Sequence, residues 1–305
     1  MNIYVKKDTS INQTLKTVNP GDILILEDGI YKEKIEVWVP NITIKAQNKH
    51  KAIISNNDYY HKIMPNNNEC NTFNTFSLYI GADNITLENL IIENTSTPSS
   101  IYGQAVALHV DGNKFKCYDC IIRSAQDTLF TGPMPKDLLV RYEGFYPPHR
   151  LKGLPSIQEY YNCQIIGDVD FIFGCATALF ENCDIITLNT NKDNLYICAP
   201  AHPKELKYGY LFYKCNIRSL GDSTSFLGRP WRDYGCAAFI ECIMDEKSII
   251  DKGFNKWDNT NRDKTARFYE YSQGINLQNR EKWIKLLEKS EAEAYIDEFK
   301  LYISK

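Results

Sequence analysis

The segments Tyr161-Asn162-Cys163-Gln164-Ile165 and Glu181-Asn182-Cys183-Asp184-Ile185 share one pattern, a cysteine followed two places later by an isoleucine. The same frame recurs along the chain in Leu87–Ile91, where leucine takes the cysteine position, and in Tyr118–Ile122, Tyr213–Ile217 and Ile240–Met244. Successive cysteine positions lie between 20 and 43 residues apart, so each interval is long enough for one coil of a solenoid. This irregular repeat predicts an all-β parallel solenoid with loops of varying length.

The cysteines themselves are interpreted as part of the core. In each repeat the cysteine and the residue two places on should share one strand face and point inward, because side chains alternate along a strand. Stacked coils would then bury a ladder of free thiols, which pack as small apolar groups. Disulfides are the alternative. A zinc site at Cys117 and Cys120 is disfavoured, because no second cysteine or histidine pair lies nearby.

The rest of the chain fits one domain spanning residues 1–305. Ile11, Leu15 and Val18 predict a short helical cap at about 9–19, which would cover the open end of the coil stack. Residues 278–304, rich in Lys, Glu and Leu, predict a C-terminal helix on the solenoid flank. The loop 131–158 contains five prolines, and it could wall a substrate groove or be a surface decoration.

Composition limits the partners. The chain has 305 residues with 43% hydrophobic side chains and a net charge of −3, so it can bury a large core and gives no reason to bind nucleic acid or a membrane. Residues 1–30 contain no secretory leader, and no run is long enough to span a bilayer. We expect a cytoplasmic monomer; a secreted protein with its leader removed is the alternative.

Two aspartates occupy the same phase of the repeat. Asp127 lies seven residues after Cys120, and Asp170 lies seven residues after Cys163. Neighbouring parallel strands are about 4.8 Å apart, so consecutive coils would bring the two carboxylates close together. Such a pair should split its pKa values, one rising and the other staying low, which makes an acid and a nucleophile available. Turn-forming aspartates are the structural alternative.

Four motifs carry a resemblance to a known family. Gly103–Leu108 (GQAVAL), Gln126–Leu129 (QDTL), Asp170–Gly174 (DFIFG) and Leu227–Trp231 (LGRPW) resemble, in the same order, segments of the pectin methylesterases, the family 8 carbohydrate esterases. The resemblance implies a right-handed single-stranded parallel β-helix. It also implies hydrolysis of galacturonate methyl esters in pectin or methylated oligogalacturonides, with release of methanol and without a metal or other cofactor.

The resemblance assigns a role to each matching residue. Asp170 matches the nucleophile that forms an acyl-enzyme, and Asp127 matches the proton donor that later acts as base. Gln104 and Gln126 match the amides that stabilise the oxyanion, and Arg229 matches the cation that holds Asp170. These residue types suit the task, since arginine keeps its charge and neutral glutamines do not depress the pKa of Asp127.

The resemblance also implies contacts to substrate. They comprise Trp231 as a platform for a sugar ring, Thr72, Phe130 and Phe173. Two positions depart from the family pattern: His109 replaces an arginine and Asp168 replaces a threonine. We interpret His109 as a structural substitution. Asp168, if it faces the site, would raise the pKa of Asp127 and shift the pH optimum upward.

Several other functions are possible on a parallel β-helix. A lyase on the same solenoid would need a calcium-binding acidic cluster, and a galacturonan hydrolase would need carboxylates at wider spacing. An esterase or thioesterase acting on another ester, and a non-catalytic carbohydrate-binding β-helix, are further alternatives. A Ser-His-Asp hydrolase is disfavoured because the chain has no GxSxG motif.

Overall fold

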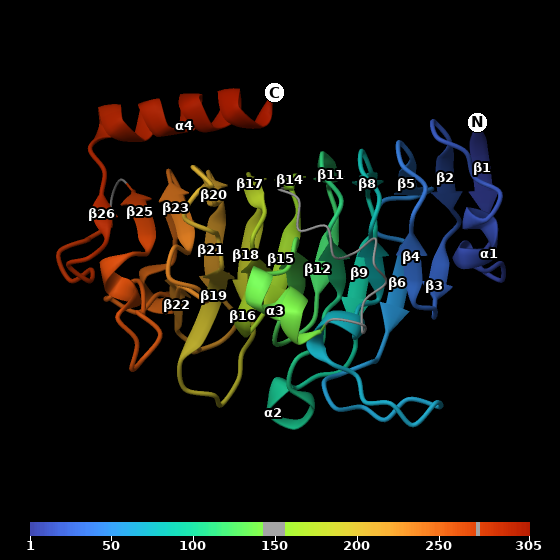
Figure 1. Ribbon diagram of the computed structural model, residues 1–305, viewed down its shortest axis with the longest axis horizontal. Coiled ribbons are helices and arrows are strands. Elements are labelled where there is room, and N and C mark those ends of the chain that lie inside the picture. The colour runs from blue at the N-terminus through green and yellow to red at the C-terminus, as the bar shows by residue number, and fades with distance from the viewer. Residues whose placement is uncertain (143–155, 273–274) are drawn as a thin grey trace.

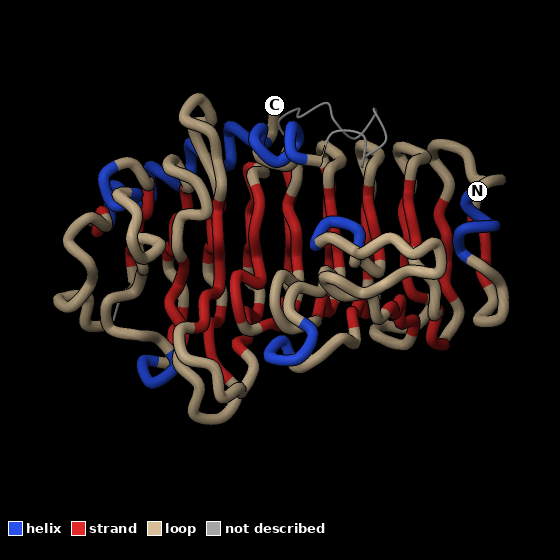
Figure 2. Tube along the Cα trace, turned by 60° about the horizontal axis from the view of Figure 1, so that its bottom comes forward, coloured by secondary structure: helices blue, strands red, loops and turns tan. Residues whose placement is uncertain are grey.

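The computed structural model describes residues 1–142, 156–272 and 275–305. In this part of the chain, short strands stack into three long parallel sheets, which Figures 1 and 2 show running the length of the molecule. Each complete coil contributes one strand to sheet A, then one to sheet B, then one to sheet C. The fold is a right-handed parallel β-helix, as the sequence predicted.

Among the described residues, sheet A contains eleven strands, in spatial order β1 (Asn2–Val5), β2 (Ile23–Leu26), β5 (Thr43–Ala46), β8 (Thr86–Glu88), β11 (Phe115–Tyr118), β14 (Ile157–Tyr161), β17 (Thr177–Glu181), β20 (Tyr210–Tyr213), β23 (Cys236–Ile240), β25 (Arg267–Tyr271) and β26 (Lys285–Leu286). Sheet B contains β3 (Gly29–Tyr31), β6 (Ala52–Asn56), β9 (Ile91–Asn94), β12 (Ile121–Arg123), β15 (Gln164–Gly167), β18 (Asp184–Thr187), β21 (Asn216–Ser219) and β24 (Ile243–Met244). Sheet C contains β4 (Ile35–Val37), β7 (Leu78–Ile80), β10 (Leu108–Val110), β13 (Leu129–Thr131), β16 (Val169–Gly174), β19 (Leu195–Pro200) and β22 (Ser225–Gly228).

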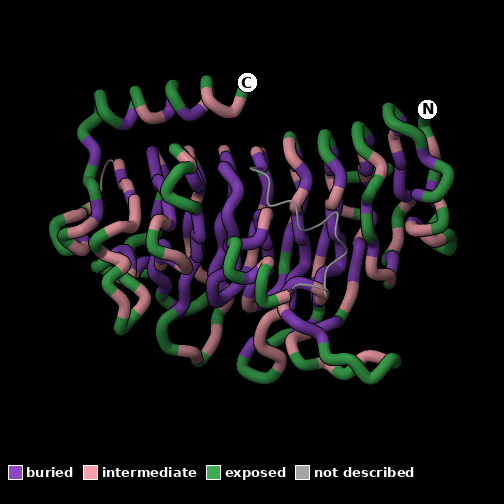
Figure 3. The backbone as a smooth tube through the Cα atoms, in the orientation of Figure 1, coloured by how far each residue is buried: buried purple, intermediate pink, exposed green. Residues whose placement is uncertain are grey.

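The interior of the coil stack is filled by side chains in register. Tyr160, Phe180, Phe212 and Phe239 stack ring on ring, with centroids 4.8, 4.7 and 4.4 Å apart and nearly parallel planes. Figure 3 shows the strands buried and the turns between them exposed. A single coil could not bury its apolar side chains by itself, so the stability of every coil depends on its neighbours.

The repeated cysteines line one corner of the coil. Cys120, Cys163, Cys183 and Cys215 are fully buried, and all ten cysteines are free thiols. The thiols of Cys163, Cys183 and Cys215 donate to carbonyl oxygens of the preceding coil, for example from Cys215 to Phe180 at 3.3 Å. A small apolar side chain with one weak donor therefore fits this position well.

The expectation that each cysteine and its following isoleucine share one strand was wrong. The cysteine stands at the corner between sheets A and B, directly after a residue with positive φ, such as Asn162 at 53° and Asn182 at 56°. Asparagine and aspartate tolerate this left-handed conformation better than other non-glycine residues. The chain turns there, and the strand of sheet B begins after the cysteine, although both side chains still face the core.

Helices cover the first coil and one flank. α1 (Ile11–Leu15) begins at the Ser10 cap and buries Ile11 and Leu15 in the core. α4 (Lys289–Ile303) lies across the outer face of sheet A (Figure 1), where it packs Ala292, Ile296 and Phe299. Shorter helical turns are α2 (Ser99–Tyr102), α3 (Lys136–Arg141), η1 (Thr72–Asn74), η3 (Glu246–Ser248) and η4 (Arg262–Lys264). None of the helices in the described residues is of the length and apolarity that a membrane crossing requires.

The C-terminal helix is shorter than the sequence pattern suggested. It begins at Lys289 and not near residue 278, because Glu288 and Glu291 form a capping box at its start. The preceding residues form β26, which extends sheet A, and Trp283 packs against the last coil of the core. Their apolar side chains therefore close the solenoid and do not continue the helix.

A buried ion pair fixes this closing segment, and it allows a prediction. Arg280 binds the fully buried Glu270 through two hydrogen bonds of 2.8 and 2.9 Å. Arg280→Met should lower the free energy of unfolding by about 3–5 kcal/mol, because it leaves a buried carboxylate without its cation. Urea unfolding followed by circular dichroism measures this, and the double variant with Glu270→Gln should recover part of the loss. An equal loss in both variants would contradict the role of the unpaired charge.

Candidate active site

The two aspartates lie level with each other on sheet C. β13 pairs with β16 so that Leu129 is opposite Ile172 and Phe130 opposite Phe173. Asp127 precedes β13 by two residues and Asp170 precedes Ile172 by two, so the same register, extended backward, sets Asp127 beside Asp170. The backbone N–H of Asp127 also donates to the carbonyl of Val169 at 3.1 Å. The two aspartates thus lie side by side on consecutive coils, and both line one pocket.

Both aspartates have unusual backbone geometry. Asp127 has a φ of 64° and Asp170 a φ of 49°. The pairing of β16 with β19 is also irregular between Val169 and Ile172, which indicates a bulge at Asp170. Bulges and left-handed residues re-aim side chains and are common beside functional sites. They let the two acids leave the regular inward and outward alternation of the strand.

Arg229, the middle residue of LGRPW, binds Asp170 with two parallel hydrogen bonds. Its Nε and Nη2 donate to the two carboxylate oxygens at 2.9 and 2.7 Å. The guanidinium also stacks between the rings of Tyr196 and Trp257, at 3.8 and 4.0 Å from their centroids. This bidentate, sandwiched arrangement fixes the orientation of the Asp170 carboxylate.

The pKa values of the two acids follow from burial and from each other. Burial raises the pKa of Asp127 well above its ordinary value, and the charge of Asp170 raises it further. Burial also raises the pKa of Asp170, although Arg229 opposes this shift. The expectation that one acid would keep a low pKa was wrong, because desolvation outweighs the arginine. The predicted order of the two pKa values is retained, because the pKa of Asp127 is raised more than that of Asp170.

The glutamines flank the acids. Gln104 and Gln126 face each other as an isolated parallel bridge, and Ala105 N–H donates to the Gln126 carbonyl at 3.0 Å. Both residues line the same pocket as the acid pair. Amide NH₂ groups placed there can donate to an oxygen that gains negative charge during acyl transfer.

The pocket around the acids has a volume of about 430 Å³. Its lining includes eight of the nine residues that the resemblance assigned to the site: Thr72, Gln104, Gln126, Asp127, Asp170, Phe173, Arg229 and Trp231. The exception is Phe130, which is fully buried against Phe73 and Phe173. Its predicted contact with substrate was wrong, because the rings of its neighbours cover it. It packs beneath Phe73 and Phe173, which line the pocket.

One wall comes from the start of the long loop. α3 contributes Leu138 and Arg141, and Tyr142 follows. The interpretation of loop 131–158 as a groove wall is supported for these residues, while 143–155 lie outside the described residues. Two hydrogen bonds of 3.0 and 2.6 Å between Asp137 and Arg232 tie the helix to the coil that carries Trp231.

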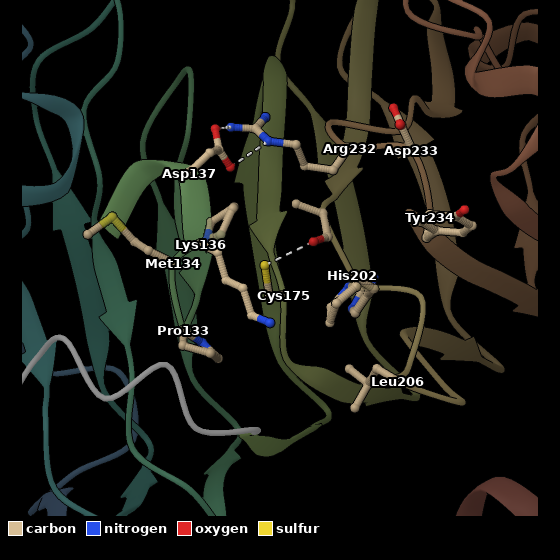
Figure 4. A pocket seen from close by; sticks show the side chains of 13 residues that line it. Pro133, Met134, Lys136, Asp137, Cys175, His202, Leu206, Arg232, Asp233 and Tyr234 are labelled. Carbon is tan, nitrogen blue, oxygen red and sulfur yellow. Dashed lines mark hydrogen bonds and ion pairs between the residues drawn. The ribbon is translucent and has the colours of Figure 1, made fainter. Parts of the chain in front are cut away.

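The same Asp137–Arg232 pair borders a second pocket of about 320 Å³ (Figure 4). Its lining is mainly apolar, with Met134, Cys175 and Leu206 among the side chains shown. His202, which also lines it, is engaged on both ring nitrogens by the backbone of Ala176 and Cys236. Burial lowers the pKa of His202 to about 3, so the ring is neutral and structural.

The two departures from the family pattern behave differently. His109 is fully buried among aromatic rings, 4.6 Å from the Phe130 centroid, with Nε2 3.1 Å from Asp111. It does not line the pocket, which agrees with a structural substitution. Asp168 is also buried, where it accepts a hydrogen bond from Ser99. Its charge raises the pKa of both Asp127 and Asp170.

We therefore expect Asp168 to influence the pH range in which the protein is active. Asp168→Asn should lower the pKa of both catalytic candidates, because it removes a neighbouring negative charge while keeping an acceptor for Ser99. If the rate requires ionised Asp170 and protonated Asp127, both limbs of the pH profile move to lower pH. The measurement is kcat against pH for the variant and the wild type. Unchanged limbs, or limbs that move upward, would contradict this assignment.

Sequence reasoning missed several residues of the site. Trp257, Tyr196 and Arg141 belong to no repeat and no strong motif, although Trp257 ends a segment of weaker resemblance at 253–257. Lys192 was missed as well; its Nζ lies 3.5 Å from Gln126 Oε1. Trp257 and Lys192 come from loops between coils, Arg141 ends α3 and Tyr196 lies in β19, so no shared periodic pattern marks them.

Fold and site together define a class: parallel β-helix proteins with a buried acid pair, held by an arginine, in a pocket on one sheet. Within it, the pectinesterase family model matches residues 5–134 and 152–301, and the chain belongs to the pectinesterase family. The resemblance found in the sequence is thereby confirmed.

Individual relatives agree with this family. Pectinesterase 31 of Arabidopsis thaliana is 29% identical over 276 residues, covering 86% of this chain and 77% of that protein. The probable pectinesterase/pectinesterase inhibitor 36 of the same plant is 28% identical over 281 residues, covering 86% of this chain. This chain spans about half the length of the first curated relatives it matches, 48% and 46%.

Solved structures share the fold. The pectin methylesterase from carrot superposes with a TM-score of 0.78 at 21% identity, covering 94% of this chain and 88% of that one. A pectin methylesterase in complex with a hexasaccharide superposes with a TM-score of 0.75 at 22% identity, covering 96% of this chain and 94% of that one. At these identities the likeness establishes the architecture alone.

Proposed function

We propose that this protein hydrolyses galacturonate methyl esters in pectin or methylated oligogalacturonides and releases methanol. The observation that carries the proposal is the bidentate Arg229–Asp170 pair beside Asp127, whose pKa is raised, in one pocket with two glutamines. An ionised nucleophile, a protonated acid and two oxyanion donors are the groups that ester hydrolysis through an acyl-enzyme needs. The family membership and the hexasaccharide complex of a structural relative support a saccharide chain as ligand.

Acylation follows from these positions. An Asp170 carboxylate oxygen attacks the ester carbonyl carbon, and the electron pair of the C=O bond moves to oxygen. Gln104 and Gln126 donate to this oxyanion. The intermediate collapses, the bond to the methoxy group breaks, and the proton of Asp127 passes to the leaving oxygen. Methanol departs, and a mixed anhydride between the galacturonate carbonyl and the Asp170 carboxylate remains as the acyl-enzyme.

Deacylation uses the same groups in reverse. Asp127, now ionised, takes a proton from a water molecule while that water attacks the carbonyl carbon of the anhydride. The bond to Asp170 breaks, and galacturonate leaves as a carboxylic acid that ionises in solution. Arg229 stabilises the departing Asp170 carboxylate through its two hydrogen bonds. Asp127 ends protonated and Asp170 ionised, ready for another cycle.

The pocket walls suggest how a sugar chain is held. Trp231 offers an aromatic side chain, and Arg141 offers a cation that can meet a free galacturonate carboxylate. Binding of partly demethylated pectin should therefore respond more to ionic strength than binding of the fully methylated polymer. The cytoplasmic location and the monomeric state stay predictions from the sequence.

Methanol release by the purified 305-residue chain tests the proposed function. The substrates are methylated oligogalacturonides and long pectin, with the Asp170→Asn variant as the control for contaminating esterase. Methanol without new reducing or unsaturated chain ends is the expected result. Chain cleavage without methanol would replace the proposal by a hydrolase or lyase, and saccharide binding without any product would replace it by a carbohydrate-binding function.

A further inference from the structure

Lys192 reaches the site from a third coil. Asp127 and Gln126 belong to the coil of β13, Asp170 to the next coil, and Lys192 to the loop between β18 and β19 in the coil after that. The loop is held in place, since Thr190 N–H donates to Ser223 at 3.0 Å and Lys192 N–H donates to Thr190 at 3.2 Å. From this base, the half-buried Lys192 side chain places its ammonium 3.5 Å from Gln126 Oε1.

This contact orients the Gln126 side chain. An ammonium group can only donate hydrogen bonds, so the amide oxygen must face Lys192 and the NH₂ group must face elsewhere. With the opposite orientation, the amide would present its oxygen to a developing oxyanion and repel it. A contact of 3.5 Å is long, and contacts of this kind often tighten when substrate binds.

We propose that Lys192 is a positioning residue that holds the Gln126 amide with its NH₂ group available to the oxyanion. The inference rests on the proposed ester hydrolysis. Lys192 does not itself line the pocket, whereas Gln126 does. Its action is therefore through Gln126 and not through direct contact with substrate.

Lys192 has a second effect, on the proton donor. The charged groups that act on Asp127 are Asp170 and Asp168, which raise its pKa, and Arg229 and Lys192, which lower it. Removing the lysine charge should raise the pKa of Asp127. Because the rate falls once Asp127 loses its proton, the basic limb of the pH profile should move to higher pH.

The test compares Lys192→Met and Lys192→Arg with the wild type, and uses Lys247→Met, an exposed lysine away from the pocket, as the matched control. Methanol release from methylated oligogalacturonides gives kcat and KM across pH. Removing a whole oxyanion donor costs about 10²–10³-fold in kcat, so losing its orientation should cost about 10-fold or more with little change in KM. Lys192→Arg, which keeps charge and donors, should recover most of the rate. Melting temperatures establish that the variants are folded.

A double-mutant cycle with Gln126→Ala tests whether Lys192 affects kcat through Gln126. In the Gln126→Ala background, Lys192→Met should change plateau kcat by less than about 2-fold while the basic limb still moves upward. An independent loss of kcat in that background, a change in KM alone, or an unaltered Lys192→Met enzyme would overturn the inference and leave the proposed function standing. A wild-type protein that releases no methanol would overturn both.

Discussion

Asp170→Asn is expected to lower kcat for methanol release by about 10⁴-fold or more, equivalent to about 5.5 kcal/mol of transition-state stabilisation. Asparagine is nearly isosteric and can still accept a hydrogen bond from Arg229, but it has no anionic oxygen to attack the ester. Initial rates on methylated oligogalacturonides measure the effect. The loss should be in kcat, because the pocket that binds the sugar chain is unchanged.

The matched control is Asp222→Asn, an exposed aspartate away from the pocket, which should keep wild-type kcat. Circular dichroism and the melting temperature should show that Asp170→Asn is folded, since the partly exposed Arg229 can still find solvent. A folded Asp170→Asn enzyme with near-normal turnover would remove the proposed nucleophile and the mechanism with it.

Asp127→Asn is expected to lower kcat on methyl esters by about 10³-fold, within the range of general acid–base catalysis. Methoxide is a poor leaving group unless it is protonated as it departs, and an amide cannot supply that proton. Deacylation should slow too, because asparagine cannot take a proton from water. The raised pKa of Asp127 is what makes it a donor in the wild type.

A nitrophenyl ester of galacturonate separates the two steps that Asp127 serves. Nitrophenolate leaves without protonation, so Asp127→Asn should release about one equivalent rapidly and then stall as the acyl-enzyme accumulates. Asp170→Asn should show no such burst. If Asp127→Asn lost as much activity on the nitrophenyl ester as on the methyl ester, with no burst, Asp127 would not be the proton donor.

The pH dependence follows from the same pair. The rate should rise as Asp170 ionises and fall as Asp127 loses its proton, and burial raises the pKa of both. The active range should therefore lie above the ordinary carboxyl range, with apparent pKa values that belong to the pair. The relation between Asp168 and this range was foreseen from strand phase, although the bulge at Asp170 means that simple alternation does not describe the strand.

Much of the architecture was readable from local patterns. The cysteine frame marks where five successive coils turn from sheet A to sheet B. Two aspartates in equal phase predicted that consecutive coils would place them side by side. Predictions from the sequence failed where the environment of a residue depends on neighbours far along the chain. Phe130 directly follows the QDTL motif that contains Asp127, but it is covered by Phe73 from an earlier coil. Residues 285–286 join a sheet where the composition suggested helix.

The order of residues was enough to define the coils and to name the acids, the glutamines and the arginine, because periodic burial and short motifs are local properties of the chain. The three-dimensional packing alone placed Lys192 against Gln126, stacked Tyr196 and Trp257 on Arg229, and raised the pKa of both aspartates. Those features arise where side chains from different coils come into contact away from water. Because the loops between strands vary in length, no pattern along the sequence predicts these contacts.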